Sequence, residues 1–185
     1  IPTDRDLLAR LYSFEPTDID IIGVRREKRN QLGAALQLAL LRHPGTPLAQ
    51  MLQDKREVPA ELLAFVAEQI VVSPTVLSDY AARGQTMTDH ARELAAKLGV
   101  RGPVRADIPL MIEAAAQAAW PTDKGLIIAA GVVAGLRQAG ILLPSISTIE
   151  RAGIAGRARA RKQAATALVA GLSTEQLAQL DTLFD

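Results

Sequence analysis

Apolar residues recur at helical spacing along nearly the whole chain. Leu32, Ala35, Leu36, Ala39 and Leu40 form the clearest stripe and fall on one face of a helix. Alternating apolar and polar runs, which would indicate strands, never exceed a few residues. The sequence therefore predicts an all-α fold, built as two consecutive small helical bundles with helix-turn-helix-like units.

Capping residues mark the expected helix starts. Hydroxyl residues followed three positions later by Asp predict starts at Thr3, Thr17 and Thr86, and Ser173 with Gln176 predicts the start of the last helix. Further helices are expected over about residues 106–120, 123–139 and 147–172, with a buried connector at 141–143.

The predicted linker is Gly99-Val100-Arg101-Gly102-Pro103. It divides the chain into a unit of residues 1–102, which holds the first helix-turn-helix, and a unit of residues 103–185, which holds a long basic helix. The polar stretch 46–58, mixed in sign, is predicted as a loop.

Residues 63–80 have the spacing of a helix-turn-helix. Two helices, Leu63–Ile70 and Pro74–Tyr80, are joined by three residues, and Ser73 before a proline is a strong helix start. The second helix would present Thr75, Ser78 and Asp79 outward, as a recognition helix does in a major groove. Val71 occupies the turn position usually filled by glycine, so we do not expect a left-handed backbone there. Plain packing of two core helices is the alternative.

A weaker echo of this motif occurs in the second half of the chain. A helix ends at Gly140, Ile141 is placed to fill a turn, and Ile146 and Ile149 would point inward from the next helix. Plain packing explains this pattern equally well. Gly131 and Gly135, inside a predicted helix, indicate a close helix crossing.

Two basic clusters stand out in a chain whose net charge is only +1. The first lies at residues 25–30, and the second spans 151–162, inside a stretch that has no acidic residue between Glu150 and Glu175. Such clusters bind phosphates with an affinity that falls with salt, although a solvated helix face is the alternative. The candidate DNA-binding residues are Arg25, Arg26, Lys28, Arg29, Asn30, Thr75, Ser78, Arg83, Ser147, Arg151, Arg157, Arg159, Arg161 and Lys162.

Signals for other classes of function are poor. The chain has no cysteine, which excludes disulfides, thiolate nucleophiles and zinc–sulfur sites. No acid–base pair, glycine-rich phosphate loop or metal-ligand spacing occurs, so we assign no catalytic residue, cofactor or metal. His43 is expected at a helix end and His90 is expected to face water. No apolar run is long enough to cross a membrane.

Several segments resemble the N-terminal region of the Tn-three-family transposases, the large replicative enzymes of bacterial transposons. The most specific is Arg-x-x-x-Asn-x-Leu-Gly-x-Ala at 26–35. The other matching segments lie at 11–14, Asp18, 36–38, 41–45, Pro59, 63–69, Tyr80, 122–126, 142–144 and 149–151.

This resemblance implies a fragment, excised from a longer chain, that binds double-stranded DNA at the terminal inverted repeats of a transposon. The family's acidic catalytic core lies far downstream and is missing here, so the fragment is expected not to be an enzyme. The implied partners are this DNA, the rest of the transposase polypeptide and a second copy in the full-length protein, in the bacterial cytoplasm.

Two other hypotheses remain open from the residues. A helical protein-interaction or oligomerisation module would use an exposed apolar stripe of Leu177, Leu180 and Leu183 in the last helix. A free-standing repressor would form a dimer on a palindromic site.

Overall fold

The computed structural model describes residues 1–182, and the side chains of residues 1–179 and 182. Within this part of the chain the fold is all-α, as the helical spacing predicts, and the only β pairing is an isolated parallel bridge between Arg101 and Ile141. The chain forms two compact units: residues 1–103 with 139–145, and residues 104–138 with the chain from 146 onward.

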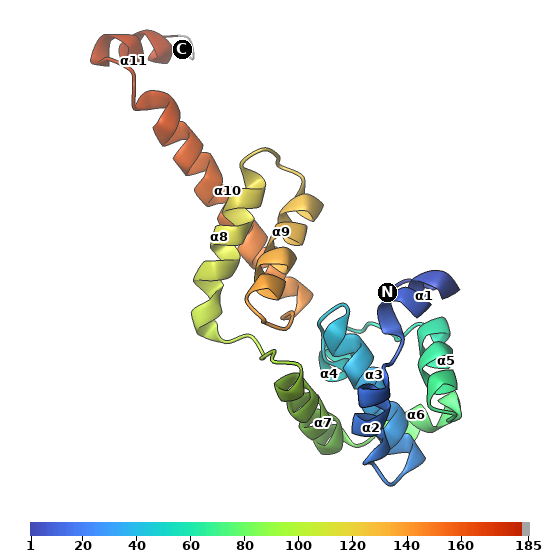
Figure 1. The fold of residues 1–185 in the computed structure, drawn as a ribbon. Coiled ribbons are helices and arrows are strands. Elements are labelled where there is room, and N and C mark those ends of the chain that lie inside the picture. The colour runs from blue at the N-terminus through green and yellow to red at the C-terminus, as the bar shows by residue number, and fades with distance from the viewer. Residues whose placement is uncertain (183–185) are drawn as a thin grey trace. The chain divides into compact units, whose positions relative to one another are not determined.

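The first unit is built around one buried helix (Figure 1). Its helices are α1 (Arg5–Tyr12), α2 (Pro16–Gly23), α3 (Lys28–Arg42), α4 (Leu48–Gln53), α5 (Ala60–Gln69), the 3-10 turn η1 (Pro74–Val76), α6 (Leu77–Ala81) and α7 (Gly84–Lys97). Every residue of α3 from Leu32 to Leu41 is buried, because α2, α4, α5, α6 and α7 all pack on it. The apolar stripe that includes Leu32 and Ala35 is therefore part of a helix that is covered on all sides.

The ion pair between Asp18 and Arg42 ties α2 to the end of α3. Both carboxylate oxygens of Asp18 accept from the guanidinium at 2.6 Å, and Asp18 Oδ2 also accepts from the backbone N–H of Glu15 at 2.9 Å. Burial by itself would raise the pKa of Asp18, but these hydrogen bonds hold it below its usual value. Asp18, one of the residues that carry the family resemblance, thus has a structural role.

Several predicted helix boundaries are wrong. Asp4, not Thr3, caps α1, because its carboxylate accepts from the N–H groups of Asp6 and Leu7. Helix α2 begins at Pro16 and α7 at Gly84. At α1 and α2, neighbouring acidic side chains bond the free backbone donors, whereas no side-chain hydrogen bond caps the start of α7.

The predicted loop at 46–58 contains the helix α4. Leu48 and Met51 are buried, and the Gln37 side chain of α3 accepts from the N–H of Leu48 at 3.1 Å and donates to the carbonyl of Met87 at 3.0 Å. These contacts come from distant segments, so the local pattern of polar residues could not predict them.

The connector at 139–145 packs with the first unit. Leu142 is buried in the core of that unit, and its N–H donates to the carbonyl of Arg101 at 2.8 Å. The N–H of Leu143 donates to the carbonyl of Gly45 at 2.8 Å. The prediction of a buried connector is confirmed, whereas Ile146 is 44% exposed, so the expectation that it points inward is wrong.

The second unit contains η2 (Arg105–Asp107), α8 (Ile108–Ala119), α9 (Gly125–Gln138), α10 (Ile146–Val169) and α11 (Thr174–Asp181). Helix α8 packs on both α9 and α10. The crossings are close: a Cβ on Gly131 would overlap that of Ala118, and one on Gly156 would overlap that of Ala115. The predicted close crossing at Gly131 and Gly135 is confirmed.

The far half of α10 extends beyond these crossings. From Arg161 to Val169 every residue except the half-buried Ala164 is exposed. As predicted, Ser173 and Gln176 cap α11 reciprocally, with bonds of 2.9 and 3.2 Å. Leu177 is exposed, while the side chains of Leu180 and Leu183 in the predicted stripe lie outside the described part of the chain.

No single helix within residues 1–182 is long and apolar enough to cross a bilayer. The segments Ala60–Gln69 and Pro74–Ala81 reach that length and hydropathy only when taken together, and they meet at 109°.

Candidate nucleic-acid interface

A sharp corner joins α5 to the segment Pro74–Ala81, and the two cross at 109°. Val66 and Ala67 of α5 are buried, as is Tyr80 at the other side of the corner. The Ser73 hydroxyl accepts from the N–H of Thr75 at 3.4 Å, which is the predicted cap. Ile70, Val72 and Leu77 are partly buried and pack on the same core.

Val71 in this corner adopts φ = +55°, in the left-handed region. The expectation that a valine excludes this conformation is wrong. The Val71 side chain is 87% exposed, so burial of the side chain does not hold the backbone there. Instead, the N–H of Val72 donates to the carbonyl of Ala67 at 3.0 Å, which closes the helix end and fixes the turn.

Tyr80 anchors the corner on α3 and α7. Its ring lies against Gly33 and stacks on His90, with ring centroids 5.7 Å apart and an interplanar angle of 21°. The Tyr80 hydroxyl lies 3.3 Å from His90 Nδ1. Burial raises the pKa of Tyr80 to about 12.

His90 is half-buried, so the prediction that it faces water is wrong. Burial lowers the pKa of His90, and the nearby guanidinium of Arg25 lowers it further, against the opposing effect of Glu93 and Asp89. The neutral imidazole is therefore the form that this packing favours.

The outer face of the corner carries small hydroxyl residues. Thr75 and Ser78 are both exposed. The Thr75 hydroxyl lies 2.8 Å from that of Ser73, and the Ser78 hydroxyl donates to the carbonyl of Thr75 at 3.2 Å. Arg83, also exposed, stands just before α7. This face is polar; it also exposes the carboxylate of Asp79, and Arg83 adds a positive charge at one end.

The first basic cluster divides into a buried and an exposed part. Arg25 is only 7% exposed; it donates to the carbonyl of Ile21 and to Glu93 at 2.8 Å. Arg26 and Lys28 are exposed and form no ion pair with any described carboxylate. Arg25 therefore connects α2 to α7, while Arg26 and Lys28 face solvent.

Arg29 and Asn30 share one acidic neighbour. Arg29 pairs with Glu27 at 2.6 Å, and the Asn30 amide donates to the same carboxylate at 3.3 Å. This contact neutralises Arg29 in part and holds both side chains at the start of α3. The pair is solvent-accessible, and such surface pairs contribute little stability.

The start of α3 and the α5–α6 corner lie at one end of the first unit. Gly23 and Gln31 line the same surface hollow as Ile70 and Val71. Gly23 and Gln31 flank the exposed segment that carries Arg26 and Lys28, so the two ends of this segment lie beside the corner.

The second basic cluster lies on α10, in the second unit. Arg159 pairs with Glu113 at 3.0 Å, and Arg161 pairs with Asp123 at 3.0 Å. Lys162 is exposed and has no ion pair with the described acids, and Arg157 is half-buried. Near the start of the helix, Arg151 donates to the carbonyl of Ser147 at 3.2 Å.

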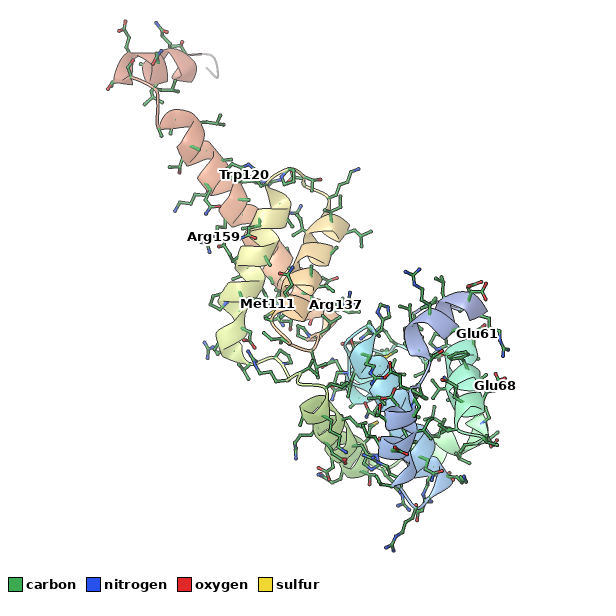
Figure 2. The ribbon with its side chains drawn as sticks, viewed as in Figure 1. Glu61, Glu68, Met111, Trp120, Arg137 and Arg159 are labelled. Carbon is green, nitrogen blue, oxygen red and sulfur yellow. The ribbon has the colours of Figure 1, made fainter. Side chains whose placement is uncertain are left out.

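The structure adds a residue that the sequence analysis missed. Trp120 is at the end of α8 (Figure 2), is 60% exposed, and lines a surface hollow together with Arg161 of α10. The sequence did contain a signal for this residue, because Trp120 is the only tryptophan of the chain. Within the described residues no group of three His, Asp or Glu side chains is placed to hold a metal ion.

Comparison with known proteins shows the family to which the chain belongs. Residues 1–156 match the family described as "Domain of unknown function (DUF4158)". The chain belongs to this family. It is also similar to the transposase for transposon Tn501 of Pseudomonas aeruginosa, at 35% identity, and to that for transposon Tn21 of Escherichia coli, at 33%, each over 99% of the chain. A third relative is the transposase for transposon gamma-delta of Escherichia coli (strain K12), 40% identical over 45% of the chain.

The DUF4158 chain spans 18% of the length of the first two transposases and 8% of the third. These similarities confirm the resemblance to the N-terminal region of Tn-three-family transposases. The roles predicted for the individual basic and hydroxyl residues stay predictions.

Proposed function

We propose that this chain is a DNA-binding part of a transposase, which recognises the terminal inverted repeats of a transposon and does not itself cleave DNA. The observation that carries the proposal is the α5–α6 corner, whose Thr75, Ser78 and Arg83 are exposed, with the two ends of the basic segment 24–30 beside it. Exposed cations next to a helix that can enter a groove supply the phosphate contacts that set its register.

The geometry of the corner supports this role. Helices of a helix-turn-helix cross at about 90–120°, and α5 meets Pro74–Ala81 at 109°. The left-handed residue at Val71 occupies the turn position where this motif usually has glycine. Pro74–Ala81 is then the recognition helix, with Thr75 and Ser78 toward base edges and Arg83 on a phosphate.

Arg25 is left out of the proposed surface. Its guanidinium is buried against Ile21 and Glu93, so a phosphate could reach it only by breaking these contacts. A loss of DNA binding in an Arg25→Ala variant would therefore follow from a loosened fold.

The test is binding of the purified chain to the terminal inverted repeat of its parent element and to a shuffled duplex, across a salt series. We expect a preference for the repeat and a steep decrease of affinity with salt. Equal, weak binding to both duplexes would overturn the proposal of specific recognition. Neither duplex should be cut when a divalent cation is added.

Charge-removing variants locate the surface. Arg26→Gln and Lys28→Gln should each weaken binding to both duplexes and lower the salt slope by about one unit. Lys55→Gln is the matched control, because Lys55 is exposed in the same unit but follows α4. Equal effects of all three substitutions would show that only net charge matters.

A second function, docking of another protein segment, is favoured by an apolar groove between α9 and α10. Leu126, Ile146 and Ile154 line it and are exposed, and Glu150 and Arg157 are also in its lining. The relatives are several times longer than this chain, so the proposed occupant is a helix of the remaining transposase polypeptide.

Ile154→Glu should abolish association with that polypeptide added in trans. Unchanged association would exclude the groove, and self-association of the chain alone would identify a second copy as the occupant.

A further inference from the structure

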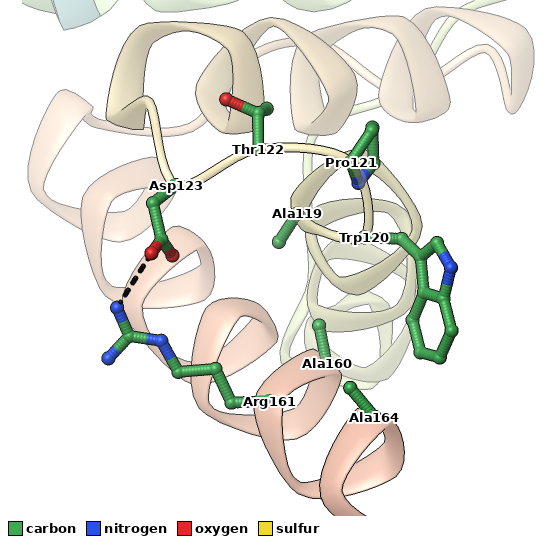
Figure 3. Close-up of a pocket in the computed structure, with 8 residues that line it drawn as sticks. All are labelled: Ala119, Trp120, Pro121, Thr122, Asp123, Ala160, Arg161 and Ala164. Carbon is green, nitrogen blue, oxygen red and sulfur yellow. Dashed lines mark hydrogen bonds and ion pairs between the residues drawn. The ribbon is translucent and has the colours of Figure 1, made fainter. Parts of the chain in front are cut away.

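The side chain of Trp120 is largely exposed and lies outside the helix crossings that hold the second unit together. The crossing of α8 and α10 is made by small residues, Ala115, Ala116 and Ala119 facing Gly156 and Ala160. The indole is 60% exposed at the end of α8 and projects away from these helices (Figure 3). A tryptophan has the largest apolar surface of any side chain, so leaving it in water forgoes stabilisation that burial would provide.

Surface hollows lie on two sides of this ring. One is lined by Trp120, Thr122, Asp123, Arg161 and Ala164 (Figure 3). The other is lined by Trp120 with Glu113, Gln117 and Gln163. The flat ring therefore stands between two concave surfaces, each of which includes a residue of α10.

Two arginines of α10 lie near these hollows. Arg161 lines the first hollow and bonds Asp123 on the side opposite the indole (Figure 3), and Arg159 bonds Glu113, which lines the second hollow. All four side chains are about half-exposed or more. Solvent-exposed ion pairs of this kind contribute little stability, so a phosphate can replace the carboxylate with little loss.

The charge around the ring favours a polyanion. The 24 positions between Glu150 and Glu175 contain four arginines and a lysine, Lys162, and no acid. Nucleic-acid-binding surfaces combine exposed aromatic rings, which pack on bases or sugars, with arginines and lysines that hold phosphates.

We propose that Trp120, Arg159 and Arg161 form a second DNA contact, on the α8–α10 face of the second unit. The indole packs on the sugar or base edge of one strand, and the two guanidinium groups exchange Glu113 and Asp123 for phosphates on either side. This inference rests on the proposed function, because it assigns a further contact on the same DNA.

The single tryptophan makes the test direct. Fluorescence of the purified chain is titrated with the inverted-repeat duplex, and binding is measured in parallel by anisotropy of a labelled duplex. We expect the Trp120 emission to be quenched along the same isotherm as the anisotropy. Trp120→Ala should weaken binding roughly tenfold, and Trp120→Phe should restore most of it. Leu168→Ala, another exposed apolar residue of this unit (77%), is the control and should bind as wild type.

Substitution of the acidic partners of the two arginines is an independent test. Asp123→Asn and Glu113→Gln each free one arginine by removing one negative charge, so each should raise the affinity at low salt. A substitution that lowers affinity without unfolding the unit would contradict the exchange of carboxylate for phosphate.

The outcomes separate this inference from the function on which it rests. If the duplex binds while Trp120 emission and the affinity of Trp120→Ala stay unchanged, the second contact is overturned and DNA binding stands. If no duplex binds at low salt, the proposed function is overturned and the contact with it. If the emission shifts with protein concentration in the absence of DNA, the ring belongs to a protein interface and the contact is overturned.

Discussion

The ring of Tyr80 lies directly against the backbone of Gly33. A Cβ built on Gly33 would overlap three carbons of that ring. This contact is how α6, which contains Tyr80, approaches the buried helix α3. It also explains why the motif at 26–35 contains a glycine: Leu32 and Ala35 are buried, and only glycine leaves room for the ring.

Gly33→Ala should destabilise the first unit by about 1–3 kcal/mol, because the added methyl group forces Tyr80 away from α3. Urea unfolding followed by circular dichroism measures the change. Gly23→Ala is the matched control: no atom lies within 4 Å of the place that its methyl group would take, so its midpoint should stay or rise slightly. Equal midpoints for the two variants would mean that Tyr80 moves away at no cost.

Val71→Gly should stabilise the unit by about 1 kcal/mol, because a valine at φ = +55° is strained and a glycine is not. The exposed side chain contributes little packing that the substitution would remove. The thermal midpoint is the measurement. Val72→Gly, next along the chain, removes a side chain that packs on the core and should lower the midpoint. A lower midpoint for Val71→Gly would contradict the left-handed turn.

Asp18→Asn should cost about 2 kcal/mol. The substitution leaves the guanidinium of Arg42 without its charged partner, although partial exposure of Arg42 to solvent reduces the loss. Asp20→Asn, an exposed change in the same helix, serves as control and should be near neutral. Since the pKa of Asp18 is lowered in the fold, this contribution is present above pH 3.8 and is lost as the pH falls below it.

His90 should make the unfolding free energy depend on pH in a higher pH range than Asp18 does. Its pKa is lowered by burial and by Arg25, so the unfolded chain binds the proton more readily than the folded one. The contribution is fully present above pH 6.5 and is lost as the pH falls below that value. The difference in unfolding free energy between wild type and His90→Gln should therefore change between about pH 7.5 and about pH 5. A difference that is constant over this range would show that the imidazole titrates freely.

Thr75→Ala and Ser78→Ala should change which bases the chain prefers, because these hydroxyls face outward from the proposed recognition helix. Binding to a panel of singly substituted repeats is the measurement. Arg26→Gln is the comparison and should weaken binding to all members of the panel alike. Uniform loss for the hydroxyl variants as well would contradict the assignment of Pro74–Ala81 as the recognition helix.

The helical spacing of apolar residues determined much of this protein by itself. It predicted the all-α class, the helices α8, α9 and α10 to within two or three residues, and the buried connector at 141–143. Local signals sufficed there because helix caps and an apolar stripe act within a few residues of one another. The resemblance at 26–35 also led to the family without any knowledge of the fold.

Only the tertiary structure decided which charged and polar residues are free to bind a partner. Arg25 and Arg26 are neighbours in one basic run, yet Arg25 is buried against Glu93 of α7, 68 positions away, while Arg26 faces solvent. His90 is covered by Tyr80 of a different helix, and Trp120 is left uncovered because small residues complete the α8–α10 crossing. These outcomes depend on contacts between segments distant in the chain, and the spacing of residues within one segment contains no information about them.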